Sequence, residues 1–166
     1  MNHYVEMLLQ PCRHTFRAKD ISKNIWHQGD LITNALNSET SLFLIEREEI
    51  KAKIRDSKGK EFDVDPHTIG ECVWDSAYIS RNSDKKVYLF TGDIVKARSI
   101  VDDHNNHSFL VAWDDYAKKM GLYCLDPTDL VSEGFYSISL CRNLDKLLIG
   151  NAFDNPELLK GSKDND

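Results

Sequence analysis

Long apolar stretches are missing from this chain of 166 residues, and no run approaches the ~20 residues that a membrane-spanning helix needs. The first residues, Met1 to Met7, also lack the basic segment and apolar core of a secretory signal. These two absences lead us to expect a cytoplasmic protein that does not enter a membrane.

Closely spaced cysteine pairs are missing too. Cys12, Cys72, Cys124 and Cys141 lie far apart, and no two of them have the spacing of a zinc knuckle. In a reducing compartment we expect four thiols that pack as small apolar side chains. A chain of this length can bury a stable core without disulfides or a structural metal.

Basic residues are in the minority. The chain holds 27 acidic and 21 basic residues, which gives a net charge of −6. Tight nonspecific binding to duplex DNA depends on Lys and Arg that neutralise phosphates, so this balance argues against it. The two short basic stretches, 51–55 and 96–98, are interpreted as solvated faces of strands or helices.

Sequence signatures of catalysis are absent as well. The chain has no Gly-x-Ser-x-Gly, His-Glu-x-x-His or Gly-Lys-Ser/Thr motif. Gly92 and Asp93 alone do not predict a phosphate-binding loop, because one glycine without a following helix N-terminus makes no anion nest. We therefore expect a protein that is not an enzyme and that carries no cofactor.

The apolar pattern predicts a mainly β fold, with an α+β arrangement as the alternative. Many short alternating segments are separated by turn signals, which favours a small antiparallel sheet or barrel with short helical segments. Regular strand–helix alternation, the mark of a doubly wound sheet, is not present. The predicted strands cover residues 14–18, 42–45, 51–55, 61–64, 72–79, 87–90, 94–101, 108–113, 121–125, 135–140 and 146–149, and residues 24–27 and 29–32 are interpreted as a hairpin. In 94–101, Val95, Ala97 and Val101 are expected on one face and Lys96 and Arg98 on the other; in 108–113, Phe109, Val111 and Trp113 share a face.

Local signals refine this prediction. Residues 56–60 favour a hairpin turn, and Asp126 with Pro127 is typical of a short helix start. Residues 19–23 are interpreted as a polar turn, and the polar stretch 114–120 could hold one helical turn. The echo between residues 29–32 and 92–95 is interpreted as one turn-into-strand device used twice. We expect a single domain over residues 1–160, with a division into an N-terminal part, 1–63, and a β-rich core, 64–160, as the alternative. Residues 161–166 are predicted to be a disordered tail.

The C-terminal region reads as a structural module. Gly150 and Asn151 tolerate the backbone conformation that a sharp exit from a strand needs. Asn155 suits the N-cap of a short helix, where its side-chain oxygen would accept a backbone N–H of the first turn. Pro156 fits the first helical position, where no donor is lost. A C-terminal helical cap is therefore predicted.

Two groups of residues are candidates for chemistry. His104 and His107, with neighbouring acids in the stretch 102–107, could hold a divalent ion, although the same stretch suits a hairpin loop. Lys96, Arg98 and Trp113 could form a single-stranded nucleic-acid surface on one sheet face. The alternative for Trp113 and the other aromatic residues is that they fill the core.

Four segments resemble the YopX family of phage and prophage proteins. They are residues 16–31, with Phe-Arg-Ala-Lys and then Trp-His-Gln-Gly-Asp-Leu; 64–71, with Pro-His-Thr-Ile-Gly-Glu; 91–96, with Gly-Asp-Ile-Val; and 149–159, with Ile-Gly-Asn and then Asn-Pro-Glu-Leu-Leu. Residues 74–86 depart from the family pattern, which usually carries Thr-Gly-Leu-x-Asp-Lys-Asn-Gly-Lys in that region.

This resemblance implies a small β-rich protein that is prone to oligomerise and has no established biochemical activity. It makes Gly92, Asp93, Gly150, Asn151 and Asn155 with Pro156 structural motif residues. The resulting expectation is a prophage-encoded, non-enzymatic protein that acts through protein contacts or self-association. The alternative is a single-stranded nucleic-acid-binding accessory protein of a phage.

Overall fold

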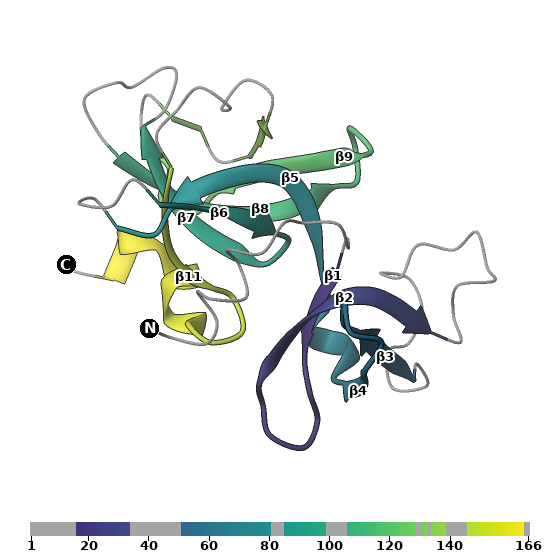
Figure 1. The fold of residues 1–166 in the computed structure, drawn as a ribbon. Coiled ribbons are helices and arrows are strands. Elements are labelled where there is room, and N and C mark those ends of the chain that lie inside the picture. The colour runs from purple at the N-terminus through teal and green to yellow at the C-terminus, as the bar shows by residue number, and fades with distance from the viewer. Residues whose placement is uncertain are drawn as a thin grey trace. The chain divides into compact units, whose positions relative to one another are not determined.

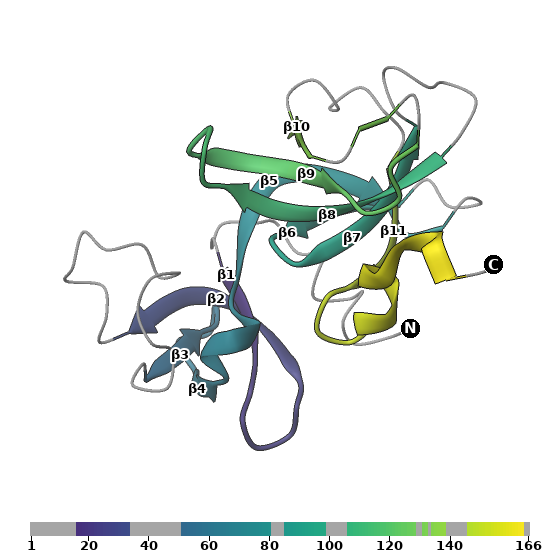
Figure 2. The same cartoon turned by 180° about the vertical axis from the view of Figure 1, so that it is seen from behind.

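The computed structural model describes residues 16–33, 51–80, 85–98, 106–128, 131–132, 134–138 and 146–164. The described chain is mostly β: it contains eleven strands and two short 3-10 helices, as Figures 1 and 2 show from opposite sides. The mainly β prediction is confirmed. The strand order does not close on itself, so the fold is the open sheet and not the barrel. Within the described ranges, no helix is long and apolar enough to cross a membrane.

The chain divides into two compact units, Met1–Cys72 and Val73–Asp166. The border lies inside strand β5 (Gly70–Tyr78), whereas the division considered from sequence, between residues 63 and 64, falls inside strand β4 (Glu61–Val64). At the C-terminus, the 3-10 helix η3 (Pro156–Asp164) continues into the polar residues for which a disordered tail is predicted.

The first unit is a small antiparallel sheet in the order β1–β2–β3–β4. It contains β1 (Phe16–Lys19), β2 (Trp26–Thr33), β3 (Ala52–Arg55) and β4, followed by the helix η2 (Pro66–Thr68). One face buries an apolar cluster formed by Ala18, Leu31, Ala52, Ile54 and Val64. Alternate residues of a strand point to the same face, which explains why Ala52 and Ile54 of β3 both belong to this core.

The two ends of this first sheet approach each other at one point. Asp20, directly after β1, forms an isolated antiparallel bridge with Val64 of β4. The backbone N–H of Ile21 donates to the carbonyl of Asp63 at 3.1 Å, and that of Asp65 donates to the carbonyl of Lys19 at 2.9 Å. A single bridge curls the sheet and covers part of the β4 edge without making a continuous ladder.

The hairpin predicted around residues 56–60 is confirmed. The Asp56 carboxylate accepts the backbone N–H groups of Lys58 and Lys60, each at 2.9 Å. Gly59 has a φ of +80°, a conformation that glycine adopts without steric cost. The β3–β4 register, from Ala52 opposite Val64 to Arg55 opposite Glu61, follows directly from this turn.

The echo between residues 29–32 and 92–95 is not one device used twice. Gly92 does lie in a turn, with a φ of +90°. Gly29 lies in the middle of β2, opposite Phe16 of β1. A Cβ atom at Gly29 would overlap the carbonyl oxygen of Arg55. The first glycine therefore allows a close backbone approach and the second allows a turn.

The second unit is built on the strand order β10–β9–β8–β7–β11–β5, and β6 pairs with β5. The strands are β6 (Lys86–Phe90), β7 (Asp93–Arg98), β8 (Asn106–Asp114), β9 (Lys119–Cys124), β10 (Phe135–Ser137) and β11 (Leu147–Asn151). The pairs β10–β9, β9–β8, β8–β7 and β7–β11 are antiparallel, whereas β11 and β5 pair in parallel, with Leu147 opposite Tyr78. Figure 2 shows β8 and β9 as a long hairpin.

Alternation along β7, β8 and β9 builds the core of this unit. Val95 and Ala97 are fully buried, as predicted, while Lys96 is half-buried and Arg98 is exposed. Phe109 lies opposite Val95 on β7 and opposite Cys124 on β9, and all three side chains are buried. The predicted faces of these strands are therefore confirmed.

Two local predictions differ from the structure, and one lies outside it. Asp126 caps no helix in the described part of its segment; its carboxylate accepts the backbone N–H of Ser108 on β8 at 2.7 Å. The stretch after Asp114 is a hairpin turn between β8 and β9 and not a helical turn. The strand predicted at residues 42–45 lies outside the described residues.

Candidate functional site

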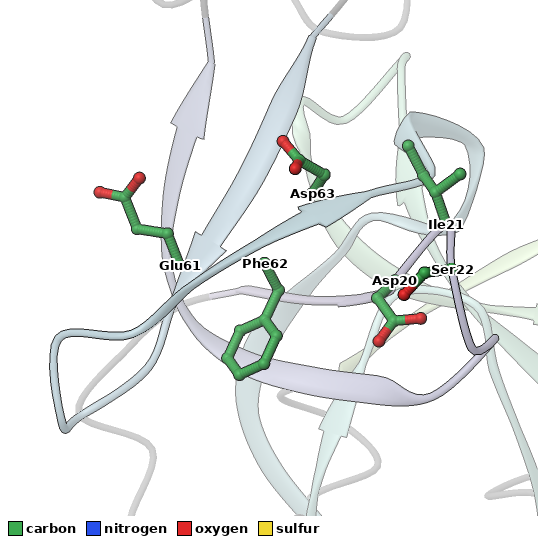
Figure 3. A pocket seen from close by; sticks show the side chains of 6 residues that line it. All are labelled: Asp20, Ile21, Ser22, Glu61, Phe62 and Asp63. Carbon is green, nitrogen blue, oxygen red and sulfur yellow. The ribbon is translucent and has the colours of Figure 1, made fainter.

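A pocket of about 550 Å³ lies in the first unit, between the turn after β1 and strand β4. Asp20, Ile21 and Ser22 line it from the turn, and Glu61, Phe62 and Asp63 line it from β4, as Figure 3 shows. Three of these six side chains are carboxylates and none is basic. The site, here called the acidic pocket, therefore presents negative charge beside apolar surface.

Asp20 anchors the turn side of the acidic pocket. Its carboxylate accepts the backbone N–H of Lys23 at 2.6 Å, and its Oδ2 lies 3.1 Å from Nε2 of His27 on β2. The His27 ring in turn stacks on Phe62, with 3.6 Å between the ring centroids. This chain of contacts fixes the turn, the β2 side chain and the β4 aromatic ring relative to one another.

Electrostatics around Asp20 favour its charged form. Burial raises the pKa of this carboxyl group, but the hydrogen bonds from His27 and from the backbone of Lys23 and Ile25 outweigh that effect. The pKa of Asp20 therefore lies below its ordinary value of 3.8. Charge at Asp20 is thus part of the folded structure of the turn at neutral pH.

Acid is expected to loosen this turn. Because the pKa of Asp20 is lowered on folding, its stabilising effect is complete above the unfolded value of 3.8 and is lost as pH falls through the folded pKa. Asp20→Asn should lower the urea midpoint at neutral pH and make its acid dependence shallower. Urea unfolding between about pH 7 and pH 3 measures this effect. Asp115→Asn, which changes an exposed carboxylate in the other unit, should leave the profile unchanged; parallel profiles for Asp20→Asn and the wild type would contradict the assignment.

The carboxylates on the β4 side of the acidic pocket are more exposed to solvent than Asp20. Oε1 of Glu61 accepts from Nη2 of Arg55 at 2.7 Å, and Lys53 Nζ lies 3.7 Å from Glu61 and 3.6 Å from Asp63. The hydrogen bond from Arg55 is the largest influence on the carboxyl group of Glu61, and it lowers the pKa. The Asp63 side chain remains 73% exposed, so it is the carboxylate most open to an incoming group.

Apolar surface borders this charge. Ile21 is 69% exposed, although it lies in a turn whose other residues are polar. Phe62 is half-buried and shows part of its ring, and Lys60 Nζ lies 4.8 Å from the centroid of that ring. Because the His27 ring stacks on Phe62 and Lys60 already lies over the ring, Phe62 contributes apolar surface to the pocket and not a free face for another cation.

The sequence-predicted nucleic-acid residues do not form one surface. Lys96 and Arg98 lie opposite Ser108 and Asn106, on the outer face of β7 and β8. Trp113 follows the alternation of Phe109 and Val111, which point to the buried face of β8. The basic and aromatic candidates therefore lie on opposite faces of the sheet.

Of the two predicted metal candidates, the described residues include His107. His104 lies outside the described residues. His107 belongs to β8 and is buried, opposite Ala97 of β7, so it is not part of a solvated loop. The β7–β8 ladder runs up to Arg98 opposite Asn106, so residues 106 and 107 of the predicted hairpin loop belong to β8, and residues 102–105 lie outside the described residues.

The structural motif residues from two distant segments meet in the second unit. Asp93 lies opposite Asn151 in the β7–β11 ladder, and the backbone N–H of Ala152 donates to the carbonyl of Gly92 at 2.8 Å. Asp93 is fully buried, and its carboxylate accepts the backbone N–H of Phe90 at 2.8 Å. We call this contact between residues 92–93 and 150–156 the junction.

Asn151 organises the C-terminal half of the junction. Its side-chain oxygen accepts the backbone N–H groups of Phe153 and Asp154 at 3.0 and 2.9 Å, and its amide nitrogen donates to the Asp154 carboxylate at 2.9 Å. Asn151 is buried, so these hydrogen bonds hold a turn and offer no open ligand site.

Asn155 acts differently from the prediction. Its side-chain oxygen accepts the backbone N–H of Asn151 at 3.3 Å and does not cap the first turn of η3. Gly150 is required for this contact, because a Cβ there would lie 2.5 Å from that oxygen. Pro156 does begin η3, as predicted, with Glu157 in the first turn.

Sequence reasoning missed the acidic pocket, since residues 19–23 were read only as a polar turn. The usable signal was Ile21, an apolar residue within that turn. Comparison with known proteins assigns no family: no protein-family model matches the chain, and no curated protein matches it at a significant level.

Proposed function

We propose that this protein works through protein contacts and that the acidic pocket binds a basic segment of a partner protein. The observation that carries the proposal is the lining itself, in which Asp20, Glu61 and Asp63 stand beside the exposed Ile21 with no basic residue among the lining side chains. A basic side chain needs both a carboxylate for its charged end and apolar surface for its stem.

The geometry gives each part of such a side chain a partner. Asp63 offers an open carboxylate to a guanidinium or ammonium group. Phe62 points to the other side of β4, as Figure 3 shows, and supplies apolar surface to the pocket there. Ile21 can cover an apolar residue next to the basic one in the partner. The net charge of −6 adds a weak, long-range attraction toward basic partners.

The resemblance to the YopX family supports the same proposal. It implies a small β-rich protein of a phage or prophage with no established biochemical activity, for which protein contacts are the simplest role. Self-association is the case in which a second copy of this chain supplies the basic segment. The single-stranded nucleic-acid alternative gains no support, because its candidate residues Lys96, Arg98 and Trp113 lie on opposite faces.

A tripeptide titration tests the proposal. Acetyl-Leu-Arg-Leu-amide is expected to shift the backbone NMR signals of residues 20–22 and 61–63, while the Gln analogue, acetyl-Leu-Gln-Leu-amide, leaves them in place. Asp63→Asn should weaken binding by up to about fivefold, which corresponds to the ~1 kcal/mol upper value for one exposed ion pair. Added salt should weaken it further, because screening reduces interactions between exposed charges.

Asp115→Asn is the matched control, since it removes an equally exposed carboxylate from the other unit. It should bind the Arg peptide as the wild type does. Equal shifts with the Arg and Gln peptides, or shifts that avoid the acidic pocket, would overturn the proposal. Size-exclusion chromatography with light scattering, at rising protein concentration, separates self-association from binding to another protein.

A further inference from the structure

Three potential metal ligands of different chemistry meet in the second unit. They are His107 on β8, Cys124 at the end of β9, and Asp126 two residues beyond it; one ligand atom from each lies within 4.8 Å of the others. The acidic pocket belongs to the other unit, so this cluster plays no part in the proposed function.

The β8–β9 register explains why these residues converge. Phe109 lies opposite Cys124, and in an antiparallel pair two steps back on one strand face two steps forward on the other. His107 therefore faces the position of Asp126. The ladder continues there, because Leu125 N–H donates to the Ser108 carbonyl at 2.9 Å and Ser108 N–H donates to the Asp126 carboxylate at 2.7 Å.

The separations suit a tetrahedral ion. Oδ1 of Asp126 lies 3.7 Å from Nδ1 of His107 and 4.0 Å from Sγ of Cys124. With ordinary zinc–ligand bond lengths, atoms in a tetrahedral shell lie about 3.3–3.7 Å apart. The two separations from Asp126 therefore need a contraction of only a few tenths of an ångström, and the separation between His107 and Cys124, which is at most 4.8 Å, needs a contraction of up to about 1 Å.

Burial and the type of donor atom narrow the choice of metal ion. The Cys124 and His107 residues are only 1% and 2% exposed, whereas the Asp126 side chain is 21% exposed, so the cluster is open on the Asp126 side. Thiolate and imidazole select Zn²⁺ over Mg²⁺ or Ca²⁺, which prefer shells made only of oxygen. Nδ1 of His107 lies 3.3 Å from the Asp126 carbonyl oxygen, and Oδ1 of Asp126, which accepts the Ser108 N–H at 2.7 Å, has further lone pairs for an ion.

We propose that His107, Cys124 and Asp126 bind one zinc ion, with a water molecule in the fourth position on the Asp126 side. The ion joins the start of β8 to the end of β9 and fixes the segment that follows Cys124. Binding requires the thiolate, so each ion should release about one proton from Cys124.

Cobalt is the spectroscopic probe for this site. Adding Co²⁺ to the metal-free protein should produce a thiolate-to-cobalt charge-transfer band and tetrahedral visible bands that saturate at one equivalent, and Zn²⁺ should then displace them. Calorimetry in buffers of different ionisation enthalpy should detect the released proton. Octahedral cobalt spectra, or no charge-transfer band at one equivalent, would overturn the proposal without any variant.

Substitutions identify the ligands. Cys124→Ser should abolish the charge-transfer band, and Asp126→Asn should weaken cobalt binding at least tenfold, the effect expected on loss of a ligand. Cys72→Ser is the control, because Cys72 is a buried thiol outside the cluster. If Cys72→Ser removes the band and Cys124→Ser retains it, the site is elsewhere and the proposal is wrong.

Discussion

Replacing Gly29 with alanine is expected to destabilise the first unit by more than about 3 kcal/mol, because overpacking of a close contact costs about that much when the obstacle cannot move. The obstacle is backbone: a Cβ at this position would overlap the Arg55 carbonyl oxygen and lie 3.1 Å from the Cα of Asp56. To relieve the overlap, β2 and β3 must separate where Asp30 lies opposite Arg55. The acidic pocket depends on this pairing, because β4, which lines the pocket, is held in the sheet by its pairing with β3.

Gly59→Ala is the matched control in the same unit. Gly59 has a φ of +80°, but an added Cβ would meet no atom within 4 Å. Its cost should therefore be only that of a positive φ, about 1 kcal/mol. Urea unfolding gives the two stabilities, and hydrogen exchange of residues 26–33 and 51–64 should locate the Gly29→Ala effect. Equal costs for the two alanine variants would show that the close approach at Gly29 is not limiting.

The positions of strands can be predicted from the sequence where one face of the strand is buried and the other is not. The alternation of Val95 and Ala97 with Lys96 and Arg98 predicts β7 and its buried face, because a period of two is itself the strand signal. The turn at residues 56–60 predicts the β3–β4 hairpin for a similarly local reason. Both features depend on neighbours in sequence, so no knowledge of the fold was needed.

Features that depend on residues distant in the sequence could not be predicted from it. Gly29 looked like a turn glycine because its sequence context matches that of Gly92, yet its role is set by the carbonyl of Arg55 on β3. Asp126 looked like a helix cap before a proline, but its carboxylate is taken by the backbone of Ser108 on β8. Tertiary hydrogen bonds outweigh local capping preferences in such cases.

The two candidate sites show the same limit. The acidic pocket forms because a single bridge, Asp20 to Val64, brings the turn after β1 against β4. Local signals existed in the exposed Ile21 and in the Cys124-x-Asp126 spacing, which places two ligands on one face of an extended segment. Neither signal predicts which other residues complete the site, because the register between strands decides which residues lie next to one another.

Replacing Asp93 with alanine is expected to destabilise the second unit by about 3 kcal/mol, the scale of a buried hydrogen bond to a charged group. The Asp93 carboxylate is fully buried and accepts the Phe90 N–H at 2.8 Å, so its removal deletes a buried hydrogen bond to a carboxylate. Asp93 also lies opposite Asn151, so the loss should loosen the whole junction. Urea unfolding measures the change, and faster hydrogen exchange should extend from residues 90–93 to residues 151–155.

Asp114→Ala is the control that separates the effect of burial from the effect of losing hydrogen bonds. The Asp114 carboxylate accepts two backbone N–H groups, from Tyr116 and Ala117, each at 3.0 Å, but in an exposed turn where water can replace it. Its loss should cost no more than about 1 kcal/mol. Asp93→Asn, which keeps an acceptor oxygen for Phe90, should fall between the two alanine variants. If Asp93→Ala costs no more than Asp114→Ala, the junction is held by its backbone pairs alone, and the buried carboxylate is not what ties residues 92–93 to residues 150–156.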